Sequence, residues 1–88
     1  MMNAMIEEWV NDLLLRNDVQ NIGDLKQDMV IEEKEEIIAS IGNEKLWALG
    51  APTRKTCAMH LGNIENYEEY IVFLDTLLPG MYEESGNN

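Results

Sequence analysis

Apolar residues recur at intervals of three and four along most of this 88-residue chain, and this spacing constrains the fold more than any other feature. In the first segment the apolar residues are Met2, Met5, Ile6, Trp9, Val10, Leu13 and Leu14. An α-helix places residues with this spacing on one face, so the pattern predicts a helix from Ala4 to Arg16 with Asn3 as its N-cap. No segment alternates between apolar and polar residues as a half-buried strand would. The sequence therefore predicts an all-α protein.

Turn-forming residues separate this helix from the next apolar segment. They predict a loop over residues 17–27, with one helical turn around 24–27. A second helix is predicted over residues 28–41, capped by Asp28 and stopped by Gly42 and Asn43. A short third helix is expected over residues 44–49, before Gly50-Ala51-Pro52 ends it.

Thr53 is predicted to cap the last long segment. Its apolar stripe consists of Cys57, Leu61, Ile64, Ile71, Leu74 and Leu78. The pattern allows one helix over residues 53–78 or two helices that meet near Gly62, Asn63 and Asn66. Residues 83–88 are expected to form a disordered tail. The chain is thus predicted to form one domain over residues 1–82, a small bundle of three to five helices.

The charge of the chain is strongly unbalanced, because seventeen Asp and Glu stand against six Lys and Arg, giving a formal net charge of −11. Such a surface repels phosphate and anionic membranes and attracts basic partners. We therefore expect a protein partner with a basic surface rather than a nucleic acid or a membrane.

Other features favour a cytoplasmic location. Cys57 is the only cysteine, so no intrachain disulfide can form. The first residues include Glu7 and Glu8 where a signal peptide would be basic. No apolar stretch approaches the roughly 20 residues that cross a bilayer.

The residue types that carry catalysis or bind metals are sparse. Cys57 and His60 would share one helical face, but structural zinc usually has four protein ligands and the chain holds no other Cys or His. Carboxylate pairs such as Glu32 and Glu36 stand in polar runs, whereas catalytic carboxylates need environments that separate their pKa values. We therefore predict no enzymatic activity, no metal and no cofactor.

The candidate binding surface lies in the last helical segment, which combines carboxylates with aromatic rings. Its residues are Glu65, Tyr67, Glu68, Glu69, Tyr70 and Asp75. Aromatic rings often anchor interfaces, but tyrosine also commonly edges a core, and the sequence leaves both roles open. The first hypothesis is an inhibitor or adaptor that places these carboxylates in a basic groove of a nucleic-acid-handling protein.

Two alternatives remain open at this point. Residues 48–56 look like a helix-turn-helix, in which Arg54, Lys55 and Thr56 would enter the major groove and the protein would act as a dimer. The further alternative is a homo-oligomeric structural subunit whose helices pack against copies of themselves.

Overall fold

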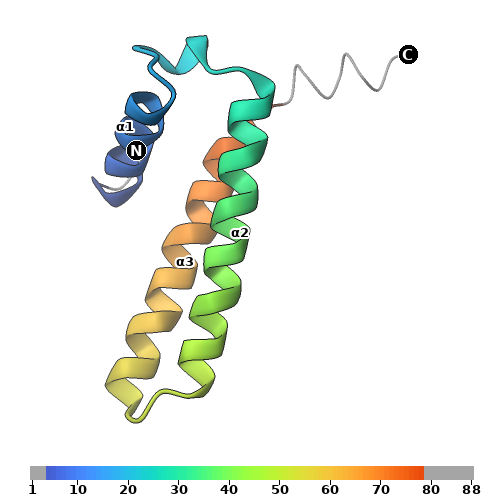
Figure 1. The fold of residues 1–88 in the computed structure, drawn as a ribbon. Helices are drawn as coiled ribbons and strands as arrows, with labels where there is room; N and C mark the ends of the chain where they lie inside the picture. Colours follow the sequence, from blue (N-terminus) through green and yellow to red (C-terminus); the bar gives the residue numbers. More distant parts are fainter. Residues whose placement is uncertain (1–3, 79–88) are drawn as a thin grey trace.

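Three α-helices dominate the computed structural model, which describes residues 4–78 (Figure 1). They are α1 (Ala4–Arg16), α2 (Gln27–Leu49) and α3 (Arg54–Thr76), and a short 3₁₀ turn, η1 (Ile22–Asp24), precedes α2. The described residues contain no strand, so the all-α prediction is confirmed and the number of α-helices is three. The predicted N-cap Asn3 and the predicted tail over residues 83–88 lie outside the described residues.

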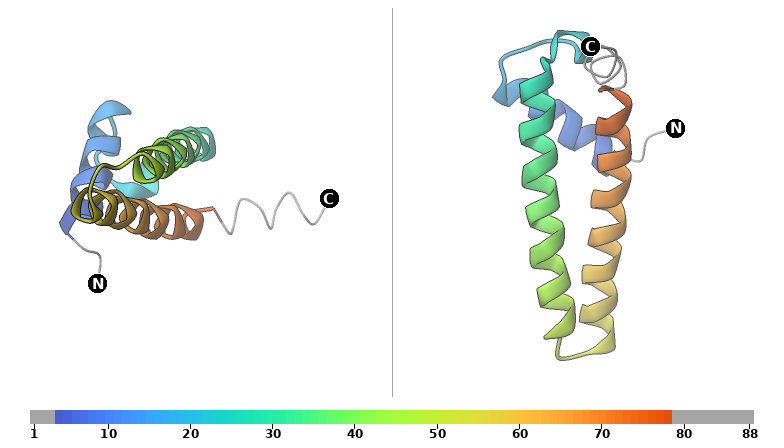
Figure 2. Two further views of the ribbon diagram at one scale, coloured as in Figure 1. Left: turned by 90° about the horizontal axis from the view of Figure 1, so that it is seen from below. Right: turned by 90° about the vertical axis from the view of Figure 1, so that its right-hand side faces the viewer.

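The fold is a long helical hairpin crossed by one short helix. α2 and α3 are antiparallel and lie side by side, joined by a tight turn over residues 50–53 (Figures 1 and 2). Each has 23 residues, which corresponds to about 35 Å at about 1.5 Å per residue. α1 has only 13 residues and lies across the half of the hairpin that is far from this turn. The half nearest the turn therefore has no third helix.

The predicted bounds of α1 are confirmed, and local chemistry explains why the helix ends where it does. The side-chain amide of Asn17 donates a hydrogen bond of 2.9 Å to the carbonyl of Leu13, one of the last carbonyls of the helix. Asp18 then adopts a positive φ of 54°, a conformation that aspartate tolerates better than most residues. The chain consequently turns away from the helix axis.

The predicted break at Gly42 and Asn43 is wrong, because α2 continues through both residues to Leu49. The expected separate helix over residues 44–49 is the end of α2. Glycine inside a helix costs about 1 kcal/mol, but Ile41 and Glu44, on either side of this pair, are both buried. Tertiary contacts thus outweigh the local stop signal.

The predicted cap of α2 is also wrong. Lys26 occupies the N-cap position without a side-chain hydrogen bond, and Asp28 lies within the first turn. A carboxylate there still interacts favourably with the positive end of the helix dipole.

α3 is a single helix, which decides the question that the sequence left open. It passes Gly62 and Asn63 without interruption. The hydroxyl of Thr53 accepts a hydrogen bond of 3.1 Å from the backbone N–H of Thr56, so the predicted N-cap is confirmed. Pairing with α2 supports the helix through its weak point, because Asn63 binds Glu44 and Ile64 is buried.

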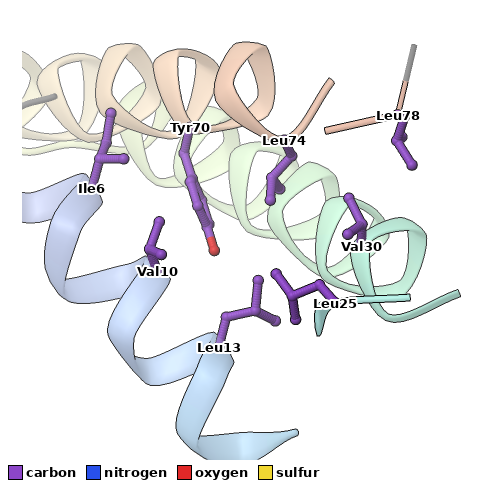
Figure 3. Close-up of a cluster of buried hydrophobic side chains, with 8 residues drawn as sticks. All are labelled: Ile6, Val10, Leu13, Leu25, Val30, Tyr70, Leu74 and Leu78. Atoms are coloured by element: carbon purple, nitrogen blue, oxygen red, sulfur yellow. The ribbon is translucent and has the colours of Figure 1, made fainter. Parts of the chain in front are cut away.

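The main core lies where α1 crosses the hairpin (Figure 3). Its buried residues are Ile6, Val10, Leu13, Leu25, Val30, Tyr70, Leu74 and Leu78. The apolar stripe predicted for α3 is only partly correct, because Leu61 is 55% exposed whereas Tyr70, outside that stripe, is fully buried. This difference arises because α1 covers only one side of α3.

Candidate functional site

Glu33 is a buried carboxylate that ties the three helices together. Its oxygens accept hydrogen bonds of 3.0 and 3.1 Å from the guanidinium of Arg16 on α1, and one of 2.7 Å from the hydroxyl of Tyr70 on α3. Arg16 also lies 2.8 Å from Asp12 and 3.6 Å from Glu36. Glu33 is 4% exposed, so it depends on these partners rather than on water for its stabilisation.

This environment raises the pKa of the Tyr70 phenol. Burial contributes most, because it disfavours the charged phenolate, and the hydrogen bond to Glu33 and the negative charge of that carboxylate add to it. Tyr70 therefore serves as a permanent hydrogen-bond donor to Glu33.

The raised pKa predicts that the protein loses stability at alkaline pH. In the unfolded chain the Tyr70 phenol ionises near its usual pKa of 10.0, whereas in the folded protein it keeps its proton. Its contribution is therefore complete below about pH 10 and declines above it by about 1.4 kcal/mol per pH unit. Urea unfolding between about pH 8 and about pH 11 should show this decline, and Tyr70→Phe should show less of it. Equal slopes for both proteins would contradict this prediction.

Glu44 forms a second buried cluster nearer the hairpin turn. It lies 2.6 Å from Nδ1 of His60 and accepts a hydrogen bond of 3.1 Å from the side chain of Asn63. The Trp47 ring lies 5.8 Å from the His60 ring, measured between centroids. The cluster joins α2 to α3 at the edge of the region that α1 covers, since Asn63 lines a pocket together with Met5 and Trp9 of α1.

Neither buried glutamate was identified from the sequence, although a signal was present. Residues of α2 spaced by three or four form one helical stripe that faces α1 and α3. This stripe consists of Val30, Glu33, Ile37, Ile41 and Glu44. A glutamate within an apolar stripe indicates a buried, partnered carboxylate. The polar run over residues 32–36 hid this pattern at Glu33, and the expected helix break at Gly42 and Asn43 hid it at Glu44.

The cysteine and histidine considered as zinc ligands are not joined by a third candidate ligand within residues 4–78. No group of three or more His, Cys, Asp or Glu side chains in this range could hold an ion. Cys57 is half-buried, and His60 is engaged by Glu44.

The candidate carboxylates of α3 lie on its surface. Glu65, Glu68, Glu69 and Asp75 are all exposed, and Asp75 forms a 2.7 Å ion pair with Lys34 of α2. Glu65, Glu68 and Asp75 lie along one side of the helix together with Val72, which is 64% exposed. We call Glu65, Glu68, Glu69, Val72 and Asp75 the acidic face.

The two candidate tyrosines are separated from the acidic face. The Tyr67 ring stacks on Trp9 of α1 with 5.0 Å between centroids, and the fully buried Tyr70 lies 5.3 Å from the same ring. Tyr70 therefore cannot serve as a surface anchor, and its hydroxyl binds Glu33 rather than water. The physical reason is that α1 packs on this side of α3, which the local sequence does not indicate.

The helix-turn-helix geometry considered for residues 48–56 is not formed. In that motif the helices meet at about 90–120°, whereas α2 and α3 are antiparallel neighbours (Figure 2). Arg54 and Lys55 are exposed at the start of α3, and Thr56 is half-buried with its hydroxyl 2.9 Å from that of Thr53. The three residues form the first turn of α3, which Thr53 caps.

The fold and the acidic face define a small three-helix protein whose described residues contain no helix long and apolar enough to cross a membrane. No protein-family model matches the chain, no curated protein is similar to it in sequence, and no solved structure matches its fold.

Proposed function

We propose that this protein is a small acidic, non-enzymatic interaction module that binds a basic surface of a partner protein through its acidic face. The observation that supports the proposal most directly is the exposure of Glu65, Glu68, Glu69 and Asp75 around the apolar side chain of Val72. Carboxylates around an exposed apolar residue suit a partner that combines basic side chains with an apolar contact.

The rigidity of α3 favours this use of the acidic face. The opposite side of the helix is held by buried Tyr70, Leu74 and Ile64. The backbone of a packed helix loses little conformational freedom when a partner binds the carboxylates on its surface. The face is therefore preorganised for binding.

The charge of the chain indicates the kind of partner. A protein surface that binds phosphates is rich in Lys and Arg, and a row of carboxylates can take the place of phosphates on it. A net charge of −11 would also accelerate the encounter with such a surface. The protein would then act as an inhibitor or adaptor of a nucleic-acid-handling protein, in the cytoplasm.

A charge-reversal experiment tests the proposal. A partner is first identified by capture from nuclease-treated lysate with mass spectrometry, and its affinity is then measured by calorimetry with both proteins purified. The variant with Glu65→Lys, Glu68→Lys and Glu69→Lys should bind this partner at least about tenfold more weakly than the unaltered protein.

A second triple variant provides the matched control. Glu7→Lys, Glu8→Lys and Asp24→Lys make the same change in net charge at exposed positions of α1 and η1. This variant should retain most of the affinity. Equal losses in both triple variants would show that only net charge matters, and no loss in either would show that the acidic face merely aids solubility.

A further inference from the structure

The half of the hairpin nearest the turn exposes unusually large apolar side chains. Five of the nine large hydrophobic residues exposed in the described part of the chain lie here, between residues 46 and 61. They are Leu46, Trp47, Leu49, Met59 and Leu61, with exposed fractions between 55% and 86%. α1 stops short of this region (Figure 1). Within residues 4–78 no third helix covers these side chains.

One side of this uncovered half is hollowed into an apolar groove. Lys45, Ala48, Leu49, Cys57, Leu61 and Ile64 line it. α1 lies on a different side, because its Trp9 packs on Tyr67 and Tyr70, and Leu61 is about half a turn from Tyr70 at 3.6 residues per turn. The groove is therefore open on the side of the hairpin that α1 leaves free.

Charge is segregated along the hairpin. Residues 42–64 hold one acidic residue, Glu44, against Lys45, Arg54 and Lys55, whereas the other described residues hold fourteen acidic and three basic residues. Glu44 is buried against His60, so the surface near the turn is basic as well as apolar. A surface complementary to this region would be apolar and would carry carboxylates.

The outer stripe of α3 supplies that complement in a second copy of the chain. Arg54, Leu61 and Glu68 are spaced by seven residues, so they lie on one stripe, and all three are exposed. When two such helices pack antiparallel with Leu61 on the twofold axis, Arg54 of each lies level with Glu68 of the other. The same register places Leu61 of one copy against Leu61 of the other.

We propose that the uncovered half of the hairpin is the interface of an antiparallel homodimer, with Leu61 at its twofold axis and Arg54 paired with Glu68 of the second copy. In this register the turn of each hairpin lies level with residues 69–72 of the other, so the two hairpins overlap along most of α3 and form a four-helix bundle there. The strongly acidic ends then point in opposite directions, separated by more than the Debye length of about 8–10 Å. This inference goes beyond the proposed function and needs no basic partner, but it uses Glu68 of the acidic face, so a second copy and a basic partner would compete for this side of α3.

A charge-swap experiment on the purified protein tests the pairing. Sedimentation equilibrium over a wide concentration range should show a monomer–dimer equilibrium for the unaltered chain. Arg54→Glu and Glu68→Arg should each raise the dissociation constant about tenfold or more, and the double variant should restore dimerisation, because both symmetry-related pairs are then reversed. Glu69→Arg changes the same charge one residue away and should leave the dimer intact.

A second pair of variants tests the apolar contact. Leu61→Glu should abolish the dimer, whereas Leu15→Glu introduces the same charge at a residue of α1 that is 79% exposed and should not. Both positions are exposed, so circular dichroism should show folded helices in each. A monomer at all concentrations, or a dimer that none of these variants weakens, would overturn the proposal. Because no partner is present, these results report self-association alone, and sedimentation of the triple variant with Glu65→Lys, Glu68→Lys and Glu69→Lys shows whether its loss of affinity accompanies loss of the dimer.

Discussion

Glu33→Ala is expected to lower the free energy of unfolding by about 3 kcal/mol, because it removes the acceptor that joins all three helices. Tyr70 would keep a fully buried hydroxyl without its acceptor. Arg16 would lose two hydrogen bonds, although its 46% exposed side chain can turn toward water. Most of the cost therefore comes from the buried tyrosine and from the space left by the missing side chain.

Urea denaturation monitored by circular dichroism at neutral pH measures this effect. Glu36→Ala is the matched control, since Glu36 stands one turn away on α2, lies 3.6 Å from the same arginine and is 61% exposed. Its removal should change stability by no more than about 0.5 kcal/mol. Similar losses for Glu33→Ala and Glu36→Ala would contradict the special role of the buried carboxylate.

Leu74→Ala is expected to destabilise the protein by about 3–4 kcal/mol. Leu74 is fully buried in the main core beside Tyr70 and Leu78. Truncation removes apolar surface from the core and leaves a cavity that the surrounding helices fill only partly. For a domain of this size, such a loss is a large fraction of the total stability.

Val72→Ala provides the comparison within the same helix. Val72 is 64% exposed, so its truncation should alter the unfolding free energy by no more than about 0.5 kcal/mol. Thermal or urea unfolding of both variants compares the loss of stability on the buried and the exposed side of α3. If Val72→Ala were as costly as Leu74→Ala, the outer side of α3 would have to be buried in solution, as a partner or a second copy could achieve.

Local patterns in the sequence predicted the helices better than they predicted the helix ends. The bounds of α1 and the Thr53 cap were correct, because a one-sided apolar stripe and a capping hydroxyl act within a few residues. The stop signal at Gly42 and Asn43 was overridden, since α2 packs against α3 on both sides of it. Contacts distant in sequence decided that point.

The candidate site shows the same difference between what the local sequence pattern predicts and what long-range packing decides. The carboxylates of the acidic face are exposed as expected from their polar surroundings in sequence, but Tyr70, only one residue from Glu69, is buried. The sequence placed the ring and the carboxylates in one helix. Which side of that helix would be covered depended on α1, more than 50 residues earlier in the chain.

The acidic, all-helical character of the chain follows from the order of its residues, because net charge and helical periodicity do not depend on contacts between distant segments. Packing between the helices, by contrast, buries Glu33 and Glu44, keeps α2 and α3 unbroken and leaves half of their hairpin without α1. These outcomes depend on which helices pack together and how far each extends. The free energy of packing distant faces exceeds the local preferences of single residues, so it selects among structures that the local pattern alone allows.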